Sequence, residues 1–119
     1  MVFYASSDSI AKVASDSAFA RIHYLNSLLS DYLDGSEVNR LSETAGTGQR
    51  FYASPILFDI LVKSQQYSRQ ANGAFDVTVG PIVQLWRRAV RRNYFPDKPQ
   101  LKEARDAVGY RLVQLRKKD

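Results

Sequence analysis

Hydrophobic residues recur at steps of three and four along the first part of the chain. Because an α-helix completes a turn about every 3.6 residues, this spacing places the side chains on one face of a helix. The segment SSD just before the stripe supplies side chains that suit a helix N-cap. We therefore predict a long amphipathic helix over residues 9–31, with an apolar stripe made of Ile10, Val13, Ala14, Ala18, Ile22, Leu25, Leu29 and Tyr32.

Capping and breaking residues mark further helices along the rest of the chain. Ser54 followed by Pro55 is typical of a helix start, because proline at the first helical position loses no hydrogen bond. Asn72 and Gly73 predict a left-handed stop with a positive φ at the glycine. The predicted helices cover residues 36–41, 55–70, 81–92 and 100–108.

Three short segments have the composition of strands, at residues 2–5, 50–53 and 110–115. The last of them needs a sheet to pack against, and a sheet of two or three short strands is marginal alone. We therefore expect a helix-rich α+β fold with three or four short strands, as an incomplete portion of a larger domain. Residues 1–119 are expected to form one part of that domain, with no internal boundary.

The composition narrows the possible chemistry. The 119 residues are 45% hydrophobic, which is enough for a real core. The absence of cysteine excludes disulfides and thiolate metal sites, and a single histidine, His23, leaves no histidine-rich metal cluster. No apolar stretch approaches the roughly 18 residues of a membrane span, and the first residues lack the pattern of a signal peptide.

The chain is basic, with a formal charge of +5 and a pI of about 9.6. A basic helix face can bind phosphate backbones or acidic proteins, but it can also be a solvated surface. No zinc-finger spacing or aromatic-interleaved motif supports nucleic acid. The basic residues concentrate on the predicted helix at residues 81–92, and we expect Leu85, Trp86 and Val90 to face inward on it. The basic residues, expected to be mostly exposed, are Arg87, Arg88, Arg91 and Arg92.

The run NGAFDVTVGPIVQLW, at residues 72–86, is unusual for a connection between helices. Its glycines permit close approach of a ligand, Asp76 offers a carboxylate, and the start of the next helix presents free N–H groups. It could therefore hold a heteroaromatic ring. The alternative is a tight connection in which Phe75 and Val79 lie in the core and Asp76 caps its own loop. The residues by themselves leave both interpretations open.

Three segments resemble the FAD:protein FMN transferases, or ApbE-type proteins. GAFDVTVGPIVQLW resembles that family's G-A-F-D-P-T-V-G-P-L-V-x-L-W motif. Upstream, LLSDYLDGSEVNRLSE resembles the family's S-x-Y-x-x-x-S-E-[IV]-x-x-[LF]-N segment. Downstream, ARDAVGYRLVQL is similar to its A-x-x-x-V-G-[YW]-x-x-V-x-[LV] segment. Because three segments occur in the right order across nearly the whole chain, the chain is identified as a member of this family.

The resemblance implies an activity and a site. Members of this family transfer the FMN part of FAD, with Mg²⁺, to a threonine of an acceptor protein and release AMP. The resemblance implies flavin contacts by Tyr32, Ala74, Phe75 and Asp76, with Thr78 supporting the loop. It assigns no catalytic residue and no metal ligand to this chain, so the Mg²⁺ ligands are expected outside it.

Some features depart from the family pattern. Val77 stands where proline is usual, Ser42 where asparagine is commoner, and Arg87 where glycine is frequent. The family's N-terminal FAD-contacting segment, its G-x-x-A-K-G-x-x-x-D stretch and its D-x-x-[ST]-[TA] magnesium ligands have no counterpart in residues 1–119. We therefore expect an N-terminal fragment of such an enzyme, inactive by itself.

The expected partners follow from the family. They are FAD and an acceptor flavoprotein that presents a threonine, with no nucleic acid. Membrane attachment is expected only through a lipid anchor not present in this chain, and the location is the bacterial cell envelope or periplasm. Two alternatives remain. One is a non-enzymatic flavin-binding relative, and the other is a basic helical module that binds nucleic acid or an acidic protein.

Overall fold

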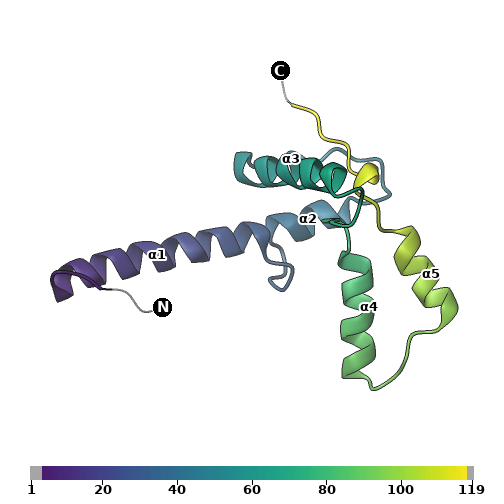
Figure 1. Cartoon of the computed structure of the whole chain (residues 1–119), viewed down its shortest axis with the longest axis horizontal. Coiled ribbons are helices and arrows are strands. Elements are labelled where there is room, and N and C mark those ends of the chain that lie inside the picture. The colour runs from purple at the N-terminus through teal and green to yellow at the C-terminus, as the bar shows by residue number, and fades with distance from the viewer. Residues whose placement is uncertain (1–3, 118–119) are drawn as a thin grey trace. The chain divides into compact units, whose positions relative to one another are not determined.

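The computed structural model describes residues 4–117, which form five α-helices and one short 3₁₀ helix (Figure 1). The chain divides into two compact units, which meet in sequence at Leu57 and Phe58. Within residues 4–117, no helix has both the length and the apolarity needed to cross a membrane. The helices are α1 (Asp8–Leu29), α2 (Glu37–Glu43), α3 (Pro55–Gln70), α4 (Gly80–Arg91), α5 (Lys98–Asp106) and the 3₁₀ helix η1 (Tyr110–Leu112).

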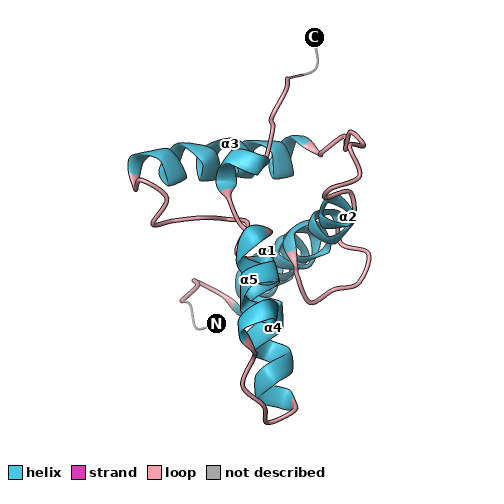
Figure 2. Ribbon diagram, turned by 90° about the vertical axis from the view of Figure 1, so that its right-hand side faces the viewer, coloured by secondary structure: helices cyan, strands magenta, loops and turns pink. Residues whose placement is uncertain are grey.

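The expectation of an α+β fold is wrong, because the described part of the chain contains no strand (Figure 2). Residues 50–53 are a loop, and residues 110–115 form η1 and an irregular segment. The expected strand at 2–5 falls mostly outside the described residues, and positions 4 and 5 are irregular. A strand needs a neighbour for its backbone groups. Between Tyr110 and Val113, side chains bind the Tyr110 amide and the Tyr110 and Val113 carbonyls, and the amides of Leu112 and Val113 bond to backbone carbonyls of the turn.

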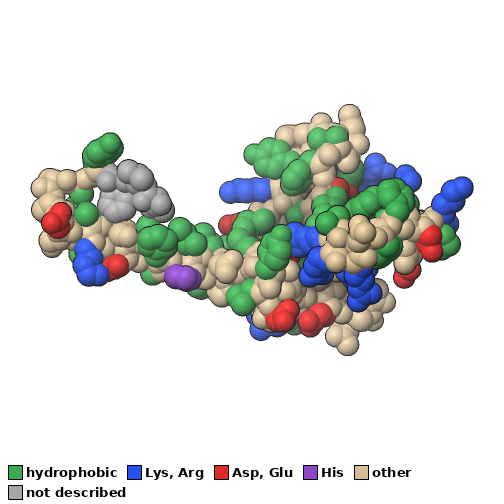
Figure 3. Space-filling view, turned by 90° about the horizontal axis from the view of Figure 1, so that it is seen from below, with side chains coloured by type: hydrophobic (Ala, Val, Ile, Leu, Met, Phe, Trp, Pro, Cys, Tyr) green, Lys and Arg blue, Asp and Glu red, His purple; other side chains and the backbone are tan. Residues whose placement is uncertain are grey.

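All five predicted helices are confirmed, with their ends within about two residues of the predicted ones. The α1 helix begins where Ser7 Oγ accepts a hydrogen bond from the Ile10 amide, at 3.3 Å. None of its 22 residues is buried, although all are described. Much of its apolar stripe is therefore exposed, with Ile10, Val13 and Ile22 about half or more exposed, and hydrophobic side chains are visible along this helix in the space-filling view (Figure 3).

A buried carboxylate joins the start of α2 to the start of α3. The Glu37 side chain accepts hydrogen bonds from the amide and the hydroxyl of Ser54, at 2.5 and 2.6 Å. Ser54 Oγ in turn accepts from the Leu57 amide at 3.3 Å and so caps α3, as the sequence predicts. Glu37 is 5% exposed, and its burial is tolerable because both oxygens are hydrogen-bonded.

In the second unit α4 and α5 pack side by side (Figures 1 and 2). On α4 the buried residues are Leu85 and Ala89, whereas Val90 is 76% exposed and Trp86 is 37% exposed, so the expected inward face is only partly right. Trp86 instead makes an edge-to-face contact with Phe95, with ring centroids 5.3 Å apart. The four arginines of this region are not buried, as predicted, and of these Arg87 is half-buried.

We predict that Glu37→Ala lowers the unfolding free energy by about 1 to 3 kcal/mol, because it leaves the Ser54 amide without its acceptor. Urea denaturation measures this loss. The matched control is Glu43→Ala, because Glu43 lies on the same helix and is exposed. Equal effects of the two substitutions would show that the Glu37 hydrogen bonds do not stabilise the fold.

Candidate functional site

The candidate loop joins α3 to α4. Gly73 has a φ of +82°, which confirms the predicted left-handed stop, and Asn72 has a φ of +49°. The Gly73 amide donates to Ser68 O at 2.8 Å, and the Ala74 amide donates to Ala71 O at 2.9 Å. The Ala74 amide is therefore already bonded within the chain, and it is not a free donor for a ligand.

Asp76 holds the loop in place. Its Oδ1 accepts hydrogen bonds from the amide and the hydroxyl of Thr78, at 2.8 and 2.7 Å. Its Oδ2 accepts from the Tyr110 amide at 2.7 Å, and Thr78 Oγ1 accepts from the Gly109 amide at 2.8 Å. We call these four hydrogen bonds the Asp76 clamp. They connect the loop to a segment that lies 31 to 34 residues further along the chain.

The clamp changes the ionisation of its carboxyl group. Burial by itself raises the pKa of Asp76, but the hydrogen bonds from the Thr78 hydroxyl, the Thr78 amide and the Tyr110 amide together outweigh it. The pKa therefore lies below its ordinary value of 3.8. Asp76 is consequently ionised at neutral pH and bonded on both oxygens.

The aromatic side chain of the loop is accessible to solvent. Phe75 is 46% exposed, and its ring meets the ring of Tyr67 edge to face, with the centroids 6.5 Å apart. Tyr67 belongs to α3 and is 59% exposed. The two rings form an accessible aromatic pair beside the loop. Tyr67 is not among the predicted site residues, because the helical pattern of residues 55–70 places it on the inner side of the helix, whereas the structure exposes it.

The two interpretations of the loop can now be compared with its geometry. Asp76 caps its own loop, as the structural interpretation supposes. Phe75 and Val79 do not lie in the core, because they are 46% and 40% exposed. The loop is thus internally braced while its aromatic side chain stays accessible, which suits a surface that binds a flat ligand.

Tyr32 belongs to the first unit, in the turn between α1 and α2. Its ring is 77% exposed and its amide donates to Ser30 Oγ at 3.2 Å. Tyr32 therefore does not close α1 as a core residue. The structure brings Ala74, Phe75 and Asp76 together in one loop of the second unit, and the assignment of Tyr32 to the same flavin site stays a prediction.

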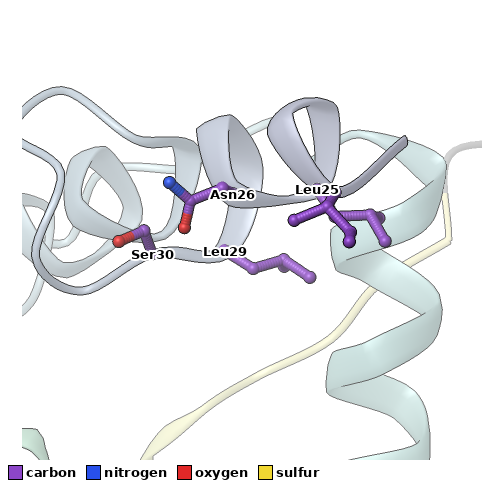
Figure 4. A pocket seen from close by; sticks show the side chains of 5 residues that line it. Leu25, Asn26, Leu29 and Ser30 are labelled. Atoms are coloured by element: carbon purple, nitrogen blue, oxygen red, sulfur yellow. The ribbon is translucent and has the colours of Figure 1, made fainter. Parts of the chain in front are cut away.

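Two surface hollows lie on single helices. One, of about 270 Å³, lies along the C-terminal end of α1 and is lined by Ile22, Leu25, Asn26, Leu29 and Ser30 (Figure 4). The other lies on α5. Neither contains a residue of the candidate loop. Across residues 4–117, no group of three His, Cys, Asp or Glu side chains is placed to hold a metal ion.

The structure thus describes a helical chain whose α3–α4 loop is a candidate ligand-binding site. Comparison with known proteins identifies the family. The chain belongs to the ApbE family, whose model matches residues 2–119. It is 28% identical over 103 residues to an FAD:protein FMN transferase of Treponema pallidum, and this alignment covers 87% of the chain. It is 29% identical over 93 residues, or 76% of the chain, to an FAD:protein FMN transferase of Haemophilus influenzae.

The family resemblance seen in the sequence is thereby confirmed. The matched regions cover 28% of the Treponema relative and 27% of the Haemophilus relative. The chain therefore spans about a quarter of the length of these curated relatives.

We predict that the stability contributed by the clamp depends on pH with a definite sign. Because the folded pKa of Asp76 lies below its unfolded value, this stability is present above the unfolded pKa and is lost as pH falls through the folded pKa. Asp76→Asn removes the titrating group. The difference in unfolding free energy between the unmodified chain and this variant should therefore become smaller as the pH falls from about 6 to about 3. Urea denaturation across this range measures it, and a deficit that does not change with pH would contradict the assignment.

Proposed function

We propose that this chain supplies a flavin-binding loop to an enzyme that transfers FMN from FAD to a protein. The observation that carries the proposal is the ApbE family match over residues 2–119. The GAFD loop within it is braced by the hydrogen bonds of the Asp76 clamp. The names of the two relatives support FAD as the substrate and a protein as the acceptor. A threonine acceptor follows from the family resemblance.

The chemistry is a phosphoryl-type substitution. The threonine oxygen attacks the phosphorus of the FMN half of FAD and forms a new P–O bond. The bond to the bridging diphosphate oxygen breaks, AMP leaves with its electron pair, and the hydroxyl proton is lost to a base. Mg²⁺ is expected in this family, but residues 4–117 offer no cluster of three ligands for it, so no step is assigned to a metal held by them.

The proposed role of the chain is to bind and orient the isoalloxazine ring. Phe75 and Tyr67 present an exposed aromatic pair that can contact the ring system. Backbone groups of the loop can pair with the polar edge of the flavin, and the flavin contact of Tyr32 stays a prediction from the family resemblance. Asp76 keeps the loop in shape, and any hydrogen bond to flavin would use a lone pair that the clamp leaves open.

We predict that Phe75→Ala weakens FAD binding by this chain about 3- to 10-fold, the range that corresponds to one lost aromatic contact. Quenching of flavin fluorescence during titration measures the dissociation constant. The control is Phe95→Ala, which removes an exposed phenylalanine of the same unit outside the loop. FAD affinity that is the same in both variants and in the unmodified chain would exclude Phe75 from the site.

We also expect the chain alone not to transfer FMN. It would be incubated with FAD, Mg²⁺ and a threonine-containing acceptor peptide, and the peptide mass would then be determined. The expected result is an unmodified peptide, because residues 4–117 bring no set of metal ligands to the diphosphate. A peptide heavier by one FMN group would show that this chain is itself a complete catalyst.

A further inference from the structure

The segment from Gly109 to Val113, which we call the anchor turn, is bound by side chains from two directions. From the loop, Asp76 accepts from the Tyr110 amide and Thr78 accepts from the Gly109 amide. From α3, Gln65 Nε2 donates to the carbonyl oxygens of Tyr110 and Val113, at 2.5 and 3.1 Å. The anchor turn therefore lies between α3 and the loop in the hydrogen-bond network.

Gln65 acts on the anchor turn and not directly on the loop. It is 8% exposed, and its amide nitrogen donates to the two carbonyl oxygens of the anchor turn. Its amide oxygen faces Arg69 on the same helix, at 3.5 Å. Burying an amide is costly unless it is hydrogen-bonded, so the environment of Gln65 favours the conformation in which the anchor turn is docked. An effect of Gln65 on the loop therefore passes through the anchor turn.

Thr78 is the link between the anchor turn and Asp76. Its hydroxyl accepts from the Gly109 amide and donates to the Asp76 carboxylate, so one oxygen serves both partners. The ring of Tyr110 lies beside Gly73, because its Cε1 is 3.6 Å from the place where an added Cβ of Gly73 would stand. The loop is thus restrained at Asp76 and Thr78 by the same distant segment.

We propose that Gln65 and the anchor turn are positioning elements of the flavin loop. Gln65 fixes the anchor turn, the anchor turn orients Asp76 and Thr78, and these two residues set the backbone path through Ala74 and Phe75. The expected effect of these elements on FAD binding rests on the proposed function. The coupling between α3 and the loop is a property of the free chain and can be tested without any ligand.

The first test is Gln65→Met, which keeps the length of the side chain but removes the donor. Amide hydrogen exchange at Thr78 should accelerate about 3- to 10-fold, the factor expected when one net hydrogen bond is lost from the network. Thr78 is the informative amide, because it bonds to Asp76 and not to Gln65. The matched control is Gln66→Met, since Gln66 is the neighbouring glutamine on α3 and is exposed.

A second pair of variants covers the case in which Gln65→Met fails to fold. Thr78→Val keeps the shape of the side chain but removes the hydroxyl, and Thr78→Ser restores the hydroxyl. Exchange at Gly109 and Tyr110 should accelerate about 3- to 10-fold in the valine variant and return towards the original rate in the serine variant. Exchange at the original rate in the valine variant would show that the Thr78 hydroxyl does not hold the anchor turn and would overturn the proposal.

FAD titration of the same variants separates this proposal from the proposed function. We expect the dissociation constant to rise about 3- to 10-fold in Gln65→Met and Thr78→Val and to stay unchanged in Gln66→Met. Unchanged Thr78 exchange in a folded Gln65→Met variant would overturn the positioning role, whatever the affinity. Accelerated Thr78 exchange in a chain that binds no FAD would establish the coupling and refute the proposed function.

Discussion

The carboxylate of Asp76 is the interaction on which the second unit most depends. Its two oxygens bind backbone and side-chain donors from Thr78 and a backbone donor from Tyr110, which is 34 residues away. A charged acceptor gives stronger hydrogen bonds than a neutral one. One side chain therefore closes a long loop that contains α4 and α5 and brings its end back to its beginning.

The same physical solution appears in each unit. In the first unit the Glu37 carboxylate binds the amide and hydroxyl at the start of α3. In the second unit Asp76 and Gln65 bind the amide and carbonyl groups of the anchor turn. In both units, polar side chains thus satisfy backbone groups of segments that the sequence favours as strands or as strand ends.

The difference between local and long-range interactions explains what could be predicted from the sequence. Helix starts depend on neighbouring residues, so Ser54 with Pro55 and the positive φ of Gly73 were recognisable. The segment 110–115 has the composition of a strand, but its conformation depends on Gln65, 45 to 48 residues away. Periodicity also assigned Trp86 and Val90 to the interior of α4, where the smaller Ala89 is buried instead.

The candidate site also depends on long-range contacts that the sequence does not reveal. The sequence identified the loop and the acceptor Asp76, but it could not show that the partners of this carboxylate lie within the chain itself. A loop that is already braced loses less conformational entropy when a ligand binds, which favours affinity. Because both oxygens of Asp76 are bonded within the chain, the accessible aromatic surface beside the loop is the ring of Phe75 with that of Tyr67 from α3. The Asp76 carboxylate therefore holds the loop, and we propose that the aromatic pair of Phe75 and Tyr67 is the part that contacts the flavin.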